Sequence, residues 1–290
     1  MIAEFADALV QGLLLGGLYA LFAAGLSLLF GIIRFVNLAH GDFIILAAYL
    51  GLMLVEATGL HPLLALLVVP PFMAALGYAG QRLLLNRVVE RGLLPAILVT
   101  FGLSIIIQNL LLEVFSANAR RVPAGALDVA SVALPGGINV GVLPLVIFAA
   151  AVLALGGLGW FFRHTMTGRL LRAVSDDPPI VGLIGADRRH LFAVATAIAA
   201  LTAGLAGVLL MMKTNFDPAA GPARLLFAFE AVIIGGLRNL WGTLAGGMIL
   251  GIAQGIGARI DPGWQLLAGH LVFLLVLAVR PRGLFGGRRR

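Results

Sequence analysis

Long apolar runs constrain this chain more than any other feature. Segments of about 20 residues with almost no charged side chains recur along most of the sequence. Such a segment is long enough to cross the hydrocarbon core of a bilayer as an α-helix. The strands of a membrane barrel would instead alternate polar and apolar residues over roughly ten positions. The pattern therefore predicts membrane-spanning helices.

The composition also indicates that lipid is the solvent. Of the 290 residues, 61% are hydrophobic and 11% are charged, whereas soluble domains carry about 25% charged residues. Backbone N–H and C=O groups in lipid must be paired within the protein, which long helices achieve. We therefore predict an all-α fold, a polytopic membrane helical bundle that forms a single domain over residues 1–290.

The expected bundle has about 8–9 spans. The region 225–258 is apolar but interrupted near Arg238 and Asn239, and we interpret it as a broken helical hairpin. The N-terminal segment has no basic residue before its first apolar run, so it does not resemble a cleaved signal peptide. The other helices are expected over residues 8–33, 40–58, 62–81, 93–115, 141–162, 190–212 and 264–280.

The basic residues set the expected orientation. If the N-terminus lies outside, fifteen of the twenty basic residues fall on the inner side and five on the outer side, as membrane proteins prefer. We therefore expect the N-terminus out and the C-terminus in. This distribution explains the net charge of +7 better than binding to nucleic acid, which we do not expect. Cysteine is absent, which excludes thiolate metal sites, and we expect neither a metal nor a cofactor.

Polar residues concentrate in the joint between the first two expected spans, which we place near the cytoplasmic mouth. Asn37 and Asp42 could simply cap the helix that follows. Alternatively, Asn37, His40 and Asp42 could face a transported molecule at a broken helix end. Both interpretations stay open.

Other polar residues fall inside apolar segments. Thr100, Ser104 and Gln108 are spaced four apart and share one helix face, and Glu230 lies in the broken hairpin. Ionisable groups at membrane depth are often functional, whereas hydroxyl groups also bond to neighbouring helices. The candidates for a translocation path are Asn37, His40, Asp42, Thr100, Ser104, Gln108 and Glu230.

Small residues recur at a spacing of four. Gly247, Gly251 and Gly255 form one such series, and Gly12 and Gly16 form another. Faces of this kind let membrane helices approach closely. We expect the Gly247, Gly251 and Gly255 face to pack against another helix.

Three motifs in order carry a resemblance to a known family. The chain resembles the LivH-type permeases of the branched-chain amino acid ABC-transporter family from about Gly12 to Phe285. The motifs are Gly16-Gly17-Leu-Tyr19 with Asn37-Leu-Ala-His40-Gly41-Asp42-Phe43, then Gly168-Arg169-Leu-Leu-Arg172-Ala173-Val-Ser-Asp176, then Gly235-Gly236-Leu-Arg238-Asn239-Leu-Trp241-Gly242.

This resemblance implies that residues 163–190 form a cytoplasmic loop whose short helix docks on an ATP-hydrolysing subunit. Arg169 and Arg172 lie three apart on one helix face, and Pro178-Pro179 predicts the end of that helix. Family members commonly have a Glu-Ala-Ala-like run where this chain has Pro178-Pro179-Ile180-Val181. The expected coupling residues are Gly168, Arg169, Arg172, Ala173, Asp176, Asp177, Gly182 and Gly185.

The expected function is transport without catalysis. The chain has no Gly-x4-Gly-Lys motif to hold ATP, so a partner must hydrolyse it. The resemblance implies a permease subunit of an importer in the cell inner membrane that moves branched-chain amino acids. Its partners would be ATP-binding cassette subunits, a second homologous permease and a periplasmic amino-acid-binding protein.

Other functions remain open at this stage. The same class of importer could carry urea or short amides, and an ion-driven transporter or channel is a further possibility. An intramembrane serine hydrolase would use Ser104 as its nucleophile and His270 as its base.

Overall fold

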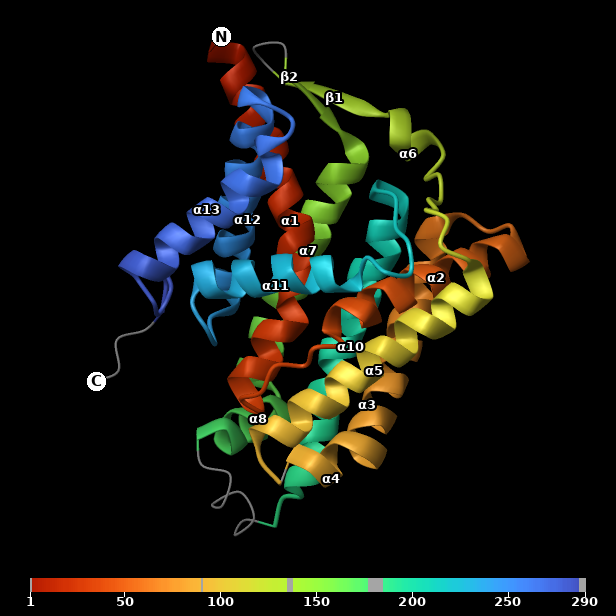
Figure 1. Cartoon of the computed structure of the whole chain (residues 1–290), viewed down its shortest axis with the longest axis vertical. Helices are drawn as coiled ribbons and strands as arrows, with labels where there is room; N and C mark the ends of the chain where they lie inside the picture. Colours follow the sequence, from red (N-terminus) through yellow and green to blue (C-terminus); the bar gives the residue numbers. More distant parts are fainter. Residues whose placement is uncertain (1, 90, 135–137, 177–184, 287–290) are drawn as a thin grey trace.

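The computed structural model describes residues 2–89, 91–134, 138–176 and 185–286, and these form a helical bundle (Figure 1). Among the described residues, seven helical segments are long and apolar enough to cross a membrane. The predicted all-α polytopic membrane fold is therefore confirmed. The seven segments are Phe5–Ile32, His40–Thr58, Pro62–Val89, Leu93–Phe115, Val142–His164, Arg188–Lys213 and Leu240–Ile260.

The helix boundaries follow the apolar runs closely. The helices expected over 40–58 and 93–115 begin and end at those residues. The first half of the bundle comprises α1 (Ile2–Ile32), α2 (His40–Thr58), the 3-10 turn η1 (Pro62–Leu64), α3 (Ala65–Gly80), the π-turn η2 (Gln81–Leu85), α4 (Asn86–Val89) and α5 (Leu93–Phe115). The second half comprises α7 (Val142–His164), α8 (Met166–Asp176), α10 (Arg188–Lys213), α11 (Gly221–Gly235), α12 (Leu240–Ile260) and α13 (Trp264–Val279).

Helix α1 is the central element, and it packs along α12 through glycines on both helices. A Cβ added at Gly12 would lie 2.8 Å from the carbonyl oxygen of Gly251, and one added at Gly247 would lie 2.6 Å from that of Gly16. A Cβ added at Gly255 would lie 2.8 Å from the carbonyl oxygen of Ala8. The two series of glycines thus face each other, and neither helix has room for a side chain there.

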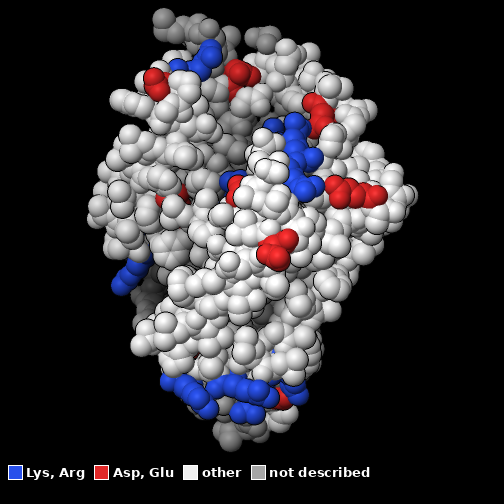
Figure 2. All heavy atoms as spheres, turned by 45° about the vertical axis from the view of Figure 1, so that its right-hand side comes forward, with Lys and Arg blue, Asp and Glu red and all other residues white. Residues whose placement is uncertain are grey.

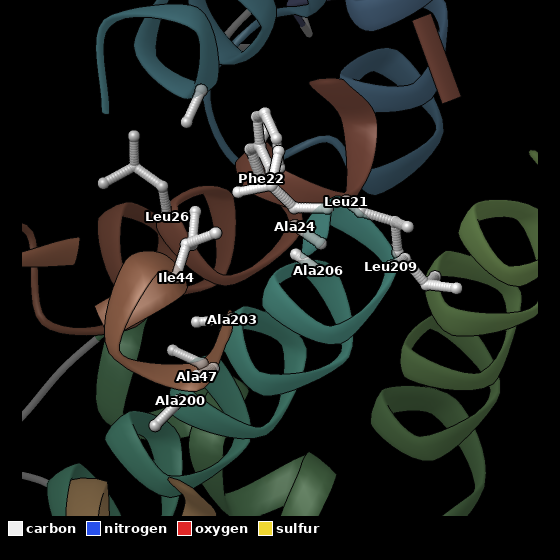
Figure 3. Packing of buried hydrophobic residues seen from close by; sticks show 14 of the residues in the cluster. Leu21, Phe22, Ala24, Leu26, Ile44, Ala47, Ala200, Ala203, Ala206 and Leu209 are labelled. Carbon is white, nitrogen blue, oxygen red and sulfur yellow. The ribbon is translucent and has the colours of Figure 1, made fainter. Parts of the chain in front are cut away.

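Alanines on α10 likewise allow this helix to pack closely against α1 and α2. Ala203 and Ala206 are fully buried, and Figure 3 shows them between side chains of α1 and α2. A Cβ added at Gly207 would lie 2.7 Å from the Cβ of Ala47. These small side chains let three apolar helices pack closely where lipid supplies no hydrophobic driving force between them.

Helix α11 runs across the bundle rather than along it. Figure 1 shows α11 crossing α1 near the middle height of the molecule, while α12 runs beside α1. The chain turns between them at Gly236 and Arg238, whose φ angles are 96° and 71°. The side chain of Asn239 then accepts a hydrogen bond from the N–H of Gly242 at 3.0 Å and caps α12. The hairpin expected over 225–258 is therefore broken where predicted.

The exact number of spans and the orientation stay predictions. Helix α11 has 15 residues and α13 has 16, which is fewer than the roughly 20 that a perpendicular span needs. Lys and Arg side chains gather at one end of the molecule, the end where Figure 1 places α4 and α8 (Figure 2). Further charged side chains of both signs lie over the upper half of the face in Figure 2, and the band directly above the basic end is largely uncharged.

The segment 116–140 holds structure that the sequence pattern did not predict. It contains the short helix α6 (Ala126–Val129) and strand β1 (Ser131–Leu134), which pairs antiparallel with β2 (Ile138–Gly141). Strands of four residues are too short to produce a recognisable alternation. Residues 135–137, including the Pro135-Gly136-Gly137 turn signal, lie outside the described residues.

Candidate functional site

The joint between α1 and α2 folds back into the bundle. The Nε2 atom of His40 lies 2.8 Å from the carbonyl oxygen of Phe22, ten residues before the end of α1, which corresponds to about 15 Å of helix. The backbone turns at Arg34, which has a φ of 63°. His40 is consequently buried beside α1, and Asn37 and Asp42 are buried as well.

Asp42 forms the centre of a side-chain cluster between three helices. The amide Nε2 of Gln108 donates hydrogen bonds of 3.0 Å to Oδ1 of Asp42 and to Oγ of Ser104. The Oδ2 atom of Asp42 is buried without a hydrogen-bond partner among the described residues. A Cβ added at Gly221 would collide with Oδ1, so the N-terminus of α11 lies directly against this carboxylate.

Thr100 and Asn37 instead hold the folded-back segment in place. The hydroxyl of Thr100 accepts from the N–H of Leu38 at 3.2 Å and donates to the carbonyl of Ile97 at 3.0 Å. The side chain of Asn37 accepts from the N–H of Ala39 at 3.1 Å. Their polar groups are satisfied locally, which favours a structural role for these two residues.

Glu230 lies further along α11, away from that cluster. Its Oε1 atom lies 2.5 Å from Nδ1 of His270 on α13, and its side chain is 1% exposed while that of His270 is 35% exposed. Ser104 and His270 therefore have different partners, Gln108 and Glu230 respectively. The serine–histidine pair that a hydrolase needs is not formed among the described residues.

The structure adds residues near Glu230 that sequence reasoning missed. The hydroxyl of Tyr19 donates a hydrogen bond of 2.5 Å to Oε1 of Gln254, and the ring of Tyr19 lies 4.9 Å from that of Phe227. Gln254 is fully buried. An amide in the middle of a Gly-rich apolar helix is itself a signal, because polar groups at that depth need a partner.

Helix α8 displays one buried and one exposed face. A Cβ added at Gly168 would lie 2.7 Å from the Cα of Phe162, so this glycine lets α8 pack tightly on the end of α7. Gly185 has a φ of 77° and is exposed, while Asp177 and Gly182 lie outside the described residues. The buried residues are Gly168, Leu171, Val174 and Ser175, and the exposed ones include Arg169, Arg172, Ala173 and Asp176.

The C-terminal end of α8 is held by two arginines from distant joints. Arg34 donates to the carbonyl oxygen of Ser175 at 2.6 Å. Arg238 donates to the hydroxyl of Ser175 at 2.8 Å and to Oδ1 of Asp176 at 3.0 Å. Ser175, Asp176 and Arg238 border a cavity of about 730 Å³ that Trp241 and residues of α1 and α7 also line. The site therefore links α8 mechanically to both interrupted regions of the bundle.

Comparison with known proteins identifies the family. The model of the family described as branched-chain amino acid transport system, permease component, matches residues 8–279. The chain belongs to this permease family. Members are transport components rather than enzymes, which agrees with the expected function class and disfavours the hydrolase. With its apolar helices, this permease is a multi-pass integral membrane protein.

Curated relatives of the permease extend over nearly its whole length. It is 28% identical to the high-affinity branched-chain amino acid transport system permease protein BraD of Pseudomonas aeruginosa, over 98% of this chain and 97% of the relative. It is also 28% identical to the corresponding permease protein LivH of Escherichia coli, over 97% of this chain and 96% of the relative. No solved structure matches the chain.

Proposed function

We propose that this permease is the membrane-spanning subunit of an ATP-driven importer that carries branched-chain amino acids across the cell inner membrane. The observation that carries the proposal is the family match over residues 8–279 together with two relatives named for this transport. Because a permease component transports as part of a system, its partners would be ATP-binding cassette subunits, a periplasmic amino-acid-binding protein and a second homologous permease.

The geometry of α8 supports a docking role for residues 163–190. Its exposed face presents Arg169 and Arg172, while its buried face anchors it on α7. Its C-terminal end is bonded to Arg34 and Arg238, which belong to the joints before α2 and α12. A partner that pulled on α8 would therefore act on both joints at once. This arrangement suits a coupling element that converts ATP hydrolysis into movement of helices.

The translocation path would follow α11. The Asp42, Ser104 and Gln108 cluster lies at its N-terminus, and Glu230 lies towards its other end. A helix that crosses the bundle can change its angle without sliding along its neighbours for its full length. We propose that small rotations of α11 open the path on alternate sides.

The gathering of Lys and Arg at the end that holds α4 and α8 (Figure 2) supports an orientation with this end in the cytoplasm. The N-terminus, at the opposite end in Figure 1, would then face the periplasm. This orientation would place α8 on the side where ATP is available.

Uptake by the reconstituted importer tests the proposed function. The permease would be co-expressed with its ATPase subunits, a second permease and a binding protein, and inserted into vesicles that contain ATP. Uptake of radiolabelled leucine that requires ATP hydrolysis and survives an uncoupler is the expected result. Uptake of urea or acetamide in place of leucine would identify the other substrate class, and uptake that an uncoupler abolishes would identify an ion-driven transporter.

A further inference from the structure

Three buried polar atoms without hydrogen-bond partners lie on α11 and on the neighbouring helix α12. They are Oε2 of Glu230, Nε of Arg224 and Nε2 of Gln254, and none has a partner among the described residues. The hydroxyl of Tyr19 bonds to Gln254 on α12 and its ring lies 4.9 Å from that of Phe227 on α11, so Tyr19 joins the two helices that carry these atoms. Buried polar groups are normally paired, so a cluster with spare hydrogen-bonding capacity indicates a ligand.

The charges in this cluster have opposite signs and a defined spacing. Arg224 and Glu230 lie six residues apart on α11, which corresponds to a rise of about 9 Å and a rotation of about 120° around the helix axis. His270 occupies one carboxylate oxygen of Glu230 and leaves the other unpaired. The Nε atom of Arg224 is likewise buried and has no hydrogen-bond partner among the described residues.

An apolar surface separates the two charges. Phe227 lies midway between Arg224 and Glu230 in the sequence of α11. Its ring is 4.9 Å from that of Tyr19 and 6.4 Å from that of His270. The cluster therefore offers an anionic group, a cationic group and an aromatic wall on a helix that crosses the bundle at middle height (Figure 1).

We propose that this cluster binds a zwitterionic α-amino acid during its passage, with the carboxylate on Arg224 and the ammonium group on Glu230. Gln254 and Tyr19 supply further hydrogen bonds, and the ring of Phe227 contacts the aliphatic side chain. The side chain of His270 is partly exposed and lies between Glu230 and the surface of the protein. The proposal rests on the proposed transport function and names the residues that recognise the substrate.

The test compares neutral and charge-retaining variants in the reconstituted importer with radiolabelled leucine. Glu230→Gln and Arg224→Gln are each expected to lower uptake about tenfold or more, because a charge-assisted contact is lost. ATP hydrolysis and the melting temperature of the complex should stay close to wild type. Glu230→Asp and Arg224→Lys should transport better than the Gln variants. Matched controls are Glu113→Gln and Arg87→Gln, which change exposed residues and should leave uptake unaltered.

The outcomes separate this site from the function itself. A wild-type complex that takes up no leucine would refute the transport function. A wild-type complex that transports, with both Gln variants within about twofold of it, would overturn the site alone. If a Gln variant fails to assemble, the charge-retaining variant at the same position, Glu230→Asp or Arg224→Lys, is used instead. Its shorter or differently shaped side chain moves the charge, so uptake equal to wild type would also overturn the site.

Discussion

The guanidinium group of Arg34 donates a hydrogen bond of 2.6 Å to the carbonyl oxygen of Ser175, which lies 141 residues further along the chain. The hydroxyl of Ser175 in turn donates to the carbonyl oxygen of Gly31 and accepts from Arg238 at 2.8 Å. One residue at the end of α8 thus connects the joint after α1 with the joint before α12. Any displacement of α8 must stretch these bonds or move both joints.

Replacing Arg34 with alanine should therefore loosen α8 without unfolding the bundle. A hydrogen bond from a charged but exposed side chain contributes about 1 kcal/mol, so amide exchange in α8 should accelerate roughly fivefold. Hydrogen–deuterium exchange followed by mass spectrometry measures this for residues 166–176. The matched control Arg87→Ala changes an exposed arginine on α4 and should have no effect there.

Arg34→Gly separates the side-chain contact from the backbone strain. A φ of 63° costs a residue with a Cβ about 1 kcal/mol, which glycine avoids. We expect Arg34→Gly to accelerate exchange in α8 as Arg34→Ala does, while the protein unfolds at a higher temperature than the alanine variant. Unchanged exchange in α8 in both variants would disprove the mechanical link.

Gly251→Ala should destabilise the contact between α1 and α12. The added Cβ would collide with the carbonyl oxygen of Gly12 and lie 2.5 Å from the backbone nitrogen of Gly16, and overpacking of this kind costs about 1–3 kcal/mol. Gly102→Ala is the matched control, because nothing lies within 4 Å of its added Cβ and alanine favours a helix. Thermal unfolding in detergent should show a lower melting temperature for the first variant only.

Gln81→Leu should destabilise the junction of α3, α4 and α10. Gln81 is fully buried, donates to Asn86 at 3.0 Å and accepts from Thr196 at 2.9 Å. Leucine would leave both partners unsatisfied, at a cost of about 1–3 kcal/mol. The control Asn109→Leu removes an exposed amide that bonds to its own helix and should not lower the melting temperature.

The sequence predicted the long helices because each ends where the local chemistry changes. The boundary after α11 is one example, since Gly236, Arg238 and Asn239 interrupt an apolar run and the chain turns at that point. The outward-facing arginines of α8 followed from their spacing of three. In both cases the information lies within a few neighbouring residues.

The sequence could not predict how the elements cross. The apolar face of α11 has the same composition whether the helix lies along the bundle or across it. Likewise, Tyr19 and Gln254 are 235 residues apart, and no local pattern shows that they meet. The folded-back segment before α2 depends on contacts with Phe22 and Thr100. A hydropathy pattern gives no information about such contacts between residues that are far apart in the sequence.

The start of α10 should lose stability in acid. Partial desolvation raises the pKa of Asp187, but hydrogen bonds from Arg82 and from the N–H groups of Arg189 and His190 lower it by more. The pKa of Asp187 therefore lies below its ordinary value. The carboxylate therefore stabilises the folded state above the unfolded pKa of about 3.9, and this contribution disappears as the pH falls through the lowered pKa. Exchange protection at residues 188–191 should be flat from pH 7 to 5 and fall below about pH 4.

Asp187→Asn distinguishes this titration from general acid unfolding. Asparagine can still cap the helix but cannot titrate. The variant should lack the acid-dependent change at residues 188–191 while the rest of α10 behaves as in wild type. An identical acid response in the variant would assign the change to other groups.

Reversing the charges of Arg169 and Arg172 should uncouple ATP hydrolysis from transport. Both side chains are exposed on α8, and neither has a hydrogen-bond or ion-pair partner within the described part of the chain, so the change to Glu leaves the packing of Gly168 and Leu171 intact. A partner surface that attracts arginine would repel glutamate, since like charges in contact are unfavourable. We expect leucine uptake to fall about tenfold or more while the melting temperature of the isolated permease stays unaltered.

Arg87→Glu serves as the control because it reverses an exposed charge on α4 at the same end of the molecule. If that variant alone lost uptake, docking would depend on α4 rather than on α8. Equal losses in both would indicate a general electrostatic attraction of the basic end for its partner, which falls as salt screens it. Uptake that falls only with Arg169 and Arg172 would place the contact on the helix that Arg34 and Arg238 tie to the two joints.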